Sequence, residues 1–271
     1  MPIDSNDKYI WFVRHAESIQ NIEPMITNIS NKDIPLTDAG RDHAHQFANI
    51  SSNIADKIFV SPYKRAISTA APFITNHYIG GKTPETIVDD NLREFQPYNS
   101  DLRDAICYLS DAAKRYCYQN HIKKYWEDLN PYKCDGCGSE TYSQFVARVV
   151  TFLSSILNRN VKGNIVVFSH YHVITLIDNL FQGNIDIDNL DTDNIFDLAG
   201  SCERIDRDPD ILKELMINTE YDSDSPIQNC TALYIRLRPY DDNSPLYRVI
   251  EYGYRDRVDV NGTMGEDILA E

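Results

Sequence analysis

The chain has 271 residues, of which 42% are hydrophobic and 25% charged, a composition typical of a globular protein with a substantial core. Its formal net charge of -15 argues against nucleic acid or an anionic membrane as a partner, because both attract basic surfaces. No apolar stretch is long enough to span a bilayer, and the N-terminus lacks a basic segment followed by an apolar run. Six cysteines are too few for a disulfide framework. The sequence therefore predicts a protein of the cytoplasm.

Apolar strands and amphipathic helices alternate along most of the chain. A helix is expected from Leu36, capped by Thr37, another that starts with Pro62 in its first turn, and a third from Tyr142, where apolar residues recur with helical spacing. A further helix is expected in "VITLIDNLF". Runs rich in β-branched and aromatic residues predict strands at 9–13, 57–61, 86–90 and 164–170, and a closing hairpin at 231–239 and 246–253 around the turn "YDDNS".

Alternating strands and helices predict an α/β fold, here a three-layer α/β/α sandwich with a mostly parallel central sheet. No linker divides the chain, so residues 1–271 are expected to form a single domain. Two segments interrupt the alternation, one at about 95–140 and an acidic one at 183–228. Both are interpreted as insertions at the rim of the domain that form a helical cap.

Polar and charged residues follow four of the predicted strands, where each strand ends. Because the carboxyl ends of parallel strands meet at one edge of an open sheet, where ligands bind, these side chains are expected to lie close together. Each residue taken singly has an ordinary structural explanation, but the set points to a binding site for an anion. The residues are Arg14 and His15 after the first strand, Arg65 after the second, Glu94 after the third and His170 after the fourth.

The order of these motifs resembles that of the histidine phosphatase superfamily, in its phosphoglycerate mutase-like branch. The chain has "RHAESIQN", "SPYKRAISTA", "LREF" and "FSHYH" in the family order, together with "IPLTDAGRDHA" and a late "QNCTALYIRL". The resemblance covers about residues 9–94 and 140–250. It implies that Ser18 and Asn21 contact the substrate phosphate, although packing or loop capping would also explain both residues.

Two positions depart from the family pattern. Ala16 stands where relatives have glycine in the first motif, which is a small change. Tyr171 stands where they have glycine after the second histidine, and its phenol ring is expected to narrow the site or to contact the substrate. Packing is the alternative for Tyr171.

The chemistry of these residue types suits phosphoryl transfer. A phosphomonoester repels nucleophiles until its oxygens are neutralised, and guanidinium groups bind those oxygens in a planar, bidentate fashion. On this scheme His15 attacks phosphorus and forms a phosphohistidine, while Arg14, Arg65 and His170 hold the transferring group. Glu94 gives a proton to the leaving alkoxide and later takes one from water. Three nearby carboxyl groups are alternatives for that role: Glu17, Glu85 and Asp90.

The expected function is therefore that of a phosphomonoesterase that works through a covalent phosphohistidine. Its partner would be a small phosphorylated substrate or a phosphoprotein, and no cofactor would be required for catalysis, because the arginines supply the positive charge. One alternative is a phosphoglycerate mutase, which returns the phosphoryl group to the bound product. The other is a non-catalytic phosphate-binding module. The set of four pocket residues plus a carboxyl group argues against the second alternative.

A group of cysteines inside the first insertion raises the separate question of a metal site. Cys117 and His121 have the i, i+4 spacing that places two side chains on one helix face, and Cys134 and Cys137 form a Cys-x-x-Cys turn. These four residues are candidate ligands of a structural zinc ion away from the phosphate site. Unrelated reduced thiols, or a redox pair at 134 and 137, remain alternatives.

Overall fold

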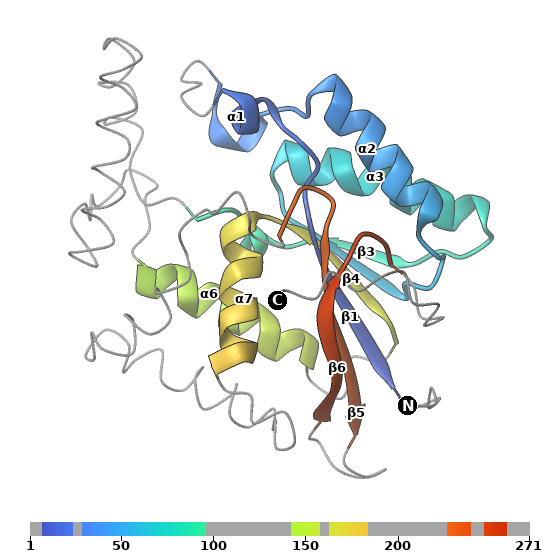
Figure 1. Cartoon of the computed structure of the whole chain (residues 1–271), viewed down its shortest axis with the longest axis vertical. Helices are drawn as coiled ribbons and strands as arrows, with labels where there is room; N and C mark the ends of the chain where they lie inside the picture. The colour runs from blue at the N-terminus through green and yellow to red at the C-terminus, as the bar shows by residue number, and fades with distance from the viewer. Residues whose placement is uncertain are drawn as a thin grey trace, which may run out of the picture.

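The computed structural model describes residues 7–23, 29–95, 142–157, 163–183, 227–239 and 247–258. Apart from their end residues, the two predicted insertions at 95–140 and 183–228 lie outside these ranges. The predicted helical cap and the assignment of the whole chain to a single domain therefore stay predictions. What the structure describes is the part of the chain that carries the predicted sheet and its helices (Figure 1).

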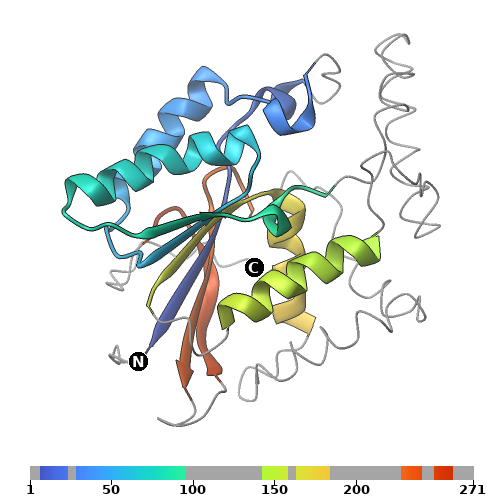
Figure 2. The ribbon, with the colours of Figure 1, turned by 180° about the vertical axis from the view of Figure 1, so that it is seen from behind.

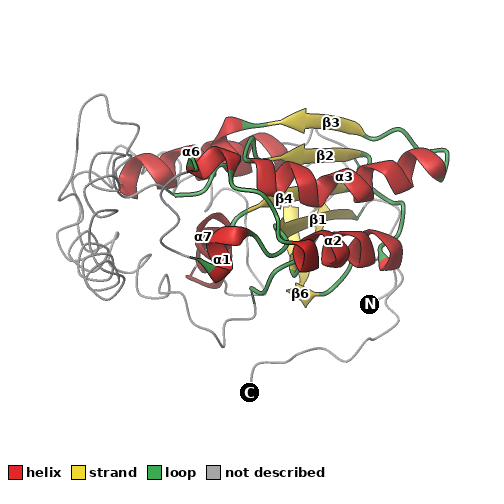
Figure 3. Cartoon of the chain, turned by 90° about the horizontal axis from the view of Figure 1, so that it is seen from above, coloured by secondary structure: helices red, strands yellow, loops and turns green. Residues whose placement is uncertain are grey.

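The centre of the fold is a six-stranded sheet with the order β3-β2-β4-β1-β5-β6. The first four strands in this order are parallel, whereas β5 pairs antiparallel with both β1 and β6. Figure 3 shows β3 at one edge of the sheet, with β2 beside it. The mostly parallel sheet and the closing hairpin predicted from the sequence are thus confirmed. The strands are β1 (Lys8–Arg14), β2 (Lys57–Val60), β3 (Glu85–Val88), β4 (Ile165–Ser169), β5 (Ala232–Pro239) and β6 (Tyr247–Arg255).

Helices cover both faces of this sheet. Figure 2 shows α2 (Asp38–Ile50) and α3 (Lys64–Ile79) on one side, and α6 (Tyr142–Leu157) and α7 (Tyr171–Gly183) on the other. The three-layer α/β/α arrangement predicted from the sequence is confirmed. None of the helices that the structure describes is long and apolar enough to cross a membrane.

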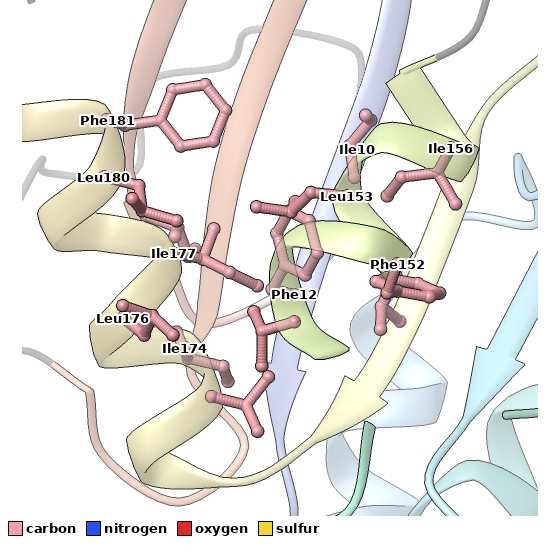
Figure 4. Packing of buried hydrophobic residues seen from close by; sticks show 14 of the residues in the cluster. Ile10, Phe12, Phe152, Leu153, Ile156, Ile174, Leu176, Ile177, Leu180 and Phe181 are labelled. Carbon is pink, nitrogen blue, oxygen red and sulfur yellow. The ribbon is translucent and has the colours of Figure 1, made fainter. Parts of the chain in front are cut away.

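Strand β1 shows why a continuous apolar run forms a central strand. Ile10 and Phe12 point into the core beneath α6 and α7, where Figure 4 shows their side chains against those of both helices. Tyr9, Trp11 and Val13 alternate with them and belong to the second core, beneath α2 and α3. A strand buried on both faces needs apolar residues at every position, and the strand becomes polar only where it reaches the edge of the sheet.

Local sequence signals predicted some helix starts correctly and missed others. The Thr37 hydroxyl accepts a hydrogen bond from the backbone N–H of Gly40, so the predicted cap of α2 is confirmed. Helix α3 begins at Lys64, two residues later than Pro62 indicated, and Arg65 still lies in its first turn. The single-turn α1 (Ile19–Ile22) and the 3-10 helices η1 (Asn31–Asp33) and η2 (Asp90–Leu92) carry no apolar periodicity and were not predicted.

Candidate active site

The ends of β1 and β4 bring two histidines side by side. Arg14 is opposite Ser169 in the parallel pairing, and the backbone N–H of His15 donates to the Ser169 carbonyl at 3.0 Å. His15 follows Arg14 at the end of β1, and His170 follows Ser169 at the end of β4. The centres of their rings lie 5.2 Å apart. Arg65 reaches the same place from the first turn of α3. The structure therefore brings together four residues that the sequence pattern had grouped.

The hydrogen bonds of His15 define which ring nitrogen carries the lone pair. Nδ1 lies 2.7 Å from the carbonyl oxygen of Ala16, and only an N–H can bond to that acceptor. Nε2 is consequently unprotonated, and Arg65 Nε donates to it at 3.2 Å. Burial, followed by the positive charges of Arg65 and Arg14, holds the pKa of His15 well below its usual range. The imidazole is thus neutral, as a nucleophile must be.

Arg65 is a buried guanidinium with several fixed contacts. Its Nη1 donates to the backbone carbonyl of Asn31 at 2.8 Å and to the Asn31 side-chain oxygen at 3.1 Å. The guanidinium also lies over the ring of Tyr63, 5.0 Å from its centre. These contacts hold the positive charge of Arg65 beside His15. An anion that enters next to His15 would meet Arg65 already in place.

Arg14 is held from two other sides. Its Nη1 donates to the carbonyl of Ile227 at 2.7 Å, and its guanidinium lies 5.2 Å from the ring centre of Tyr171. Tyr171 is buried, so the residue that replaces the family glycine supports one of the arginines. The loop before β5 also holds His15, because the side-chain amide of Asn229 donates to the His15 carbonyl at 2.7 Å. Whether Tyr171 contacts substrate stays a prediction.

His170 is bonded through one ring nitrogen. Its Nε2 lies 2.7 Å from the Ser61 hydroxyl, and the ring of Tyr63 is 5.1 Å away. Its Nδ1 is buried and has no hydrogen-bond partner among the described residues, so this atom could bond to a bound group. Burial, and then the charge of Arg65, lowers the pKa of His170 well below its usual range.

Glu94 lies beside this group and is ionised. Its Oε1 accepts a hydrogen bond from the backbone N–H of Phe95 at 2.9 Å and lies 3.2 Å from Nδ1 of His172. Burial acts to raise the pKa of Glu94, but His172, His170 and Arg65 outweigh it, and the pKa falls far below the usual value. In this arrangement Glu94 is a carboxylate that would need a proton before it could act as an acid.

A buried arginine from α6 fixes the segment that carries Glu94. Arg148 Nη1 donates to the carbonyls of Asn91 and Arg93, each at 2.7 Å, and Nη2 donates to the Glu94 carbonyl at 3.4 Å. Three carbonyls that follow β3 thus bond to one guanidinium on a neighbouring helix. The carboxyl group is held in place by packing between layers, not by the loop alone.

Ser18 and Asn21 lie in the loop and single turn of helix that follow the first motif. The backbone N–H and the hydroxyl of Ser18 both bond to Oδ1 of Asn21, at 2.8 and 2.9 Å. These bonds are what loop capping requires, and Asn21 is exposed. The predicted contacts of both residues with a substrate phosphate stay predictions.

The predicted zinc ligands Cys117, His121, Cys134 and Cys137 lie outside the described residues. Within the ranges that the structure describes, no group of three or more His, Cys, Asp or Glu side chains is placed to hold a metal ion. The zinc site remains a prediction from the sequence.

Besides Asn229, sequence reasoning missed five residues that support the site. Ser61 and Tyr63 lie inside the quoted "SPYKRAISTA", and His172 lies inside "FSHYH", so their closeness to predicted site residues was a usable signal. Asn31 and Arg148 are far from any motif, and nothing in the sequence indicates their contacts. All five act through a residue that had been predicted.

The fold and the site together define an α/β protein whose sheet carries a histidine and arginine site at its carboxyl edge. A family model described as "Histidine phosphatase superfamily (branch 1)" matches residues 10–210. The chain therefore belongs to the histidine phosphatase superfamily. No curated protein sequence matches it.

Solved structures of the same fold are similar to this chain at low sequence identity. The α-ribazole phosphatase from Shigella flexneri has a TM-score of 0.53 at 18% identity, over 93% of this chain and 98% of that one. A phosphoglycerate mutase from Bacillus anthracis has a TM-score of 0.52 at 18% identity, over 94% and 95%. A mycobacterial glucosyl-3-phosphoglycerate phosphatase has a TM-score of 0.50 at 13% identity, over 90% and 97%. At these identities the likeness concerns the fold.

Proposed function

We propose that the protein is a phosphomonoesterase that transfers the phosphoryl group to Nε2 of His15 before water removes it. The observation that carries this proposal is the state of His15. Its Nδ1 proton is bonded to the Ala16 carbonyl, its Nε2 lone pair is free of a proton, and Arg65 lies beside that lone pair. The proposal is thus supported by an imidazole nitrogen that carries no proton and by a guanidinium beside it that could bind the phosphoryl group.

In the first step the phosphoryl group binds between Arg14, Arg65 and His170. Arg65 Nε moves from the His15 lone pair to a phosphoryl oxygen, which is an acceptor of greater charge. Nε2 of His15 then forms a bond to phosphorus while the ester oxygen leaves. Glu94 gives its proton to that oxygen, so that an alcohol departs and not an alkoxide.

Glu94 gains its proton when the substrate binds. A phosphoryl dianion beside the carboxylate repels a second negative charge and raises the pKa of Glu94 from the low value set by its cationic neighbours. The carboxyl group can therefore be an acid in the complex even though it is ionised beforehand. The same dianion satisfies the charges of Arg14 and Arg65.

In the second step water attacks phosphorus and the bond to Nε2 breaks. Glu94, now a carboxylate, takes the proton that the water loses, and inorganic phosphate leaves with His15 neutral again. The loss and gain of one proton by Glu94 balance over the two steps.

The substrate of this reaction would be a small phosphorylated molecule or a phosphoprotein in the cytosol. The positive charge that phosphoryl transfer requires comes from Arg14 and Arg65, so the proposed reaction needs no metal ion. Two of the three solved neighbours described above are named as phosphatases, which supports hydrolysis over return of the phosphoryl group to a product.

A screen of phosphomonoesters with released phosphate as the readout tests the proposal. The wild type should release phosphate from at least one ester, and His15→Ala should lose turnover, whereas His45→Ala, at an exposed position of α2, should not. Transfer between phosphoglycerates with a bisphosphoglycerate primer, without phosphate release, would identify a mutase instead. Binding of phosphate esters without any turnover would identify a binding module.

A further inference from the structure

His172 lies in the first turn of α7 and contacts the predicted proton donor. Its Nδ1 is buried and lies 3.2 Å from Oε1 of Glu94. The rings of Phe95 and Tyr171 stand edge-on to the imidazole, with centres 6.0 and 5.4 Å away. These contacts hold one edge of the imidazole toward the carboxyl group. The rest of the ring is less enclosed.

The two side chains differ in their access to solvent. The side chain of Glu94 is 15% exposed, whereas that of His172 is 31% exposed. A carboxyl group that must gain and lose a proton in each turnover needs a route to water. The imidazole has two nitrogens, so a proton taken up from solvent at one can leave from the other.

We propose that His172 is a positioning residue that orients the Glu94 carboxyl group and exchanges protons between it and solvent. The inference rests on the proposed function, because it assigns a route for the proton that Glu94 transfers. When substrate binds, Nδ1–H of His172 gives its proton to the Glu94 carboxylate while Nε2 of that ring takes a proton from solvent, and Glu94 then gives this proton to the leaving oxygen. In the second step the Glu94 carboxylate takes a proton from the attacking water. When phosphate leaves, that proton passes to Nδ1 of His172, and Nε2 releases one to solvent.

The other charged groups around Glu94 cannot supply this route. Arginines keep their protons at every working pH, and the two buried histidines are occupied as nucleophile and as phosphate ligand. Tyr63 is buried and its pKa is raised to about 12, chiefly by burial, so it holds its proton. The groups that face Glu94 are His15, Tyr63, Arg65, Arg148, His170 and His172.

Replacing His172 by a side chain that cannot carry a proton removes the proposed route between Glu94 and solvent. Substrates whose leaving group needs an acid should therefore react more slowly, whereas substrates whose leaving group needs none should not.

The test compares His172→Asn and His172→Ala with the wild type and with His45→Asn, an exposed histidine of α2, as the control. Two substrates are used: p-nitrophenyl phosphate, whose leaving group needs no proton, and the best alkyl phosphate from the substrate screen. Pre-steady-state measurements follow phosphorylation of the enzyme, and imidazole is added to His172→Ala. Melting temperatures confirm that each variant is folded; if the asparagine variant is not, His172→Gln replaces it.

For the alkyl phosphate we expect phosphorylation to fall at least about tenfold at pH 7. For p-nitrophenyl phosphate we expect a change of less than about threefold, since no acid is needed. Added imidazole should restore the alanine variant. Equal losses for both substrates or no response to imidazole would each overturn the inference.

The outcome also separates this inference from the proposed function. If the wild type forms no phosphohistidine at His15, the proposed function itself is wrong. If it forms one and the His172 variants behave like the wild type, only the role of His172 is wrong.

Discussion

Replacing Arg65 tests the geometry of the site more sharply than removing the nucleophile does. Arg65→Lys keeps the positive charge but replaces a planar fork of donors with a compact ammonium group. In the wild type this guanidinium bonds at once to His15 and to Asn31, through Nε and Nη1. In the complex, Nε is expected to bond to the phosphoryl group in place of His15. A single ammonium group cannot replace both Nε and Nη1, so the lysine variant loses its bonds either to the phosphoryl group or to Asn31.

The expected loss in kcat/KM follows from the hydrogen bonds to the phosphoryl group that the lysine variant cannot make. A hydrogen bond to a charged group is worth about 1.5–3 kcal/mol, and the variant loses one or two of them to the phosphoryl group in the transition state. We take about 3 kcal/mol, which corresponds to a fall in kcat/KM of roughly a hundredfold. Arg41→Lys is the matched control, because Arg41 lies on the exposed side of α2.

The pH dependence separates charge from geometry. The pKa of His15 is lowered by burial and then by Arg65 and Arg14, and only the neutral imidazole attacks. Arg65→Met removes one lowering cause, so the pKa of His15 rises and the acid limb of kcat/KM moves to higher pH. Arg65→Lys keeps the charge, and its acid limb should stay near that of the wild type. The substrate phosphate titrates equally in all variants, so the difference between profiles reports the enzyme.

The assay is steady-state phosphate release from the best substrate of the screen, measured from pH 4 to 9 with each variant. An Arg65→Lys variant within about threefold of the wild type in kcat/KM would contradict the role of the planar fork. An acid limb that stays in place or moves to lower pH in Arg65→Met would contradict the electrostatic account of His15.

Three further predictions follow from particular residues. Gly40→Ala should lower the melting temperature by several degrees, because a Cβ there would collide with the backbone carbonyl of Glu17. The control is Ala39→Ser, at an exposed position, and an unchanged melting temperature of Gly40→Ala would count against the close approach. Glu94→Gln should slow phosphorylation by alkyl phosphates far more than by p-nitrophenyl phosphate, and equal losses would point to a purely structural side chain. Elemental analysis of protein purified without added metal should find one zinc ion per chain, lost in a Cys134→Ser/Cys137→Ser variant; substoichiometric zinc, or zinc retained in that variant, would refute the site.

The sheet and the position of the site could be predicted because the relevant signals are local. Buried strands need continuous apolar runs, and the runs in β1 and β4 end where Arg14 and His170 begin. The carboxyl ends of parallel strands share one edge, so residues that follow different strands could be grouped without knowledge of their contacts. The start of α3 was misplaced by two residues because Pro62 precedes the helix and does not open it.

What could not be predicted depends on register and on packing between layers. Glu94 follows β3 and His172 follows β4, and β2 lies between these strands in the sheet, so the sequence places both residues at one edge but does not indicate that they approach to 3.2 Å. The ionised state of Glu94 depends on that approach. The contact of Arg65 with Asn31 likewise arises because η1 packs against α3. The tautomer of His15 requires a hydrogen bond that only coordinates reveal.

The central claim is that the phosphoryl group passes through Nε2 of His15. Wild-type protein should be mixed with a phosphorus-labelled substrate, quenched in alkali within one turnover, digested, and examined by mass spectrometry and phosphorus NMR. Because Nδ1 is bonded to the Ala16 carbonyl and Nε2 carries the lone pair, the account predicts label on His15 as the Nε2-phosphohistidine. Turnover without a phosphoenzyme, label on another residue, or label on Nδ1 of His15 would contradict it.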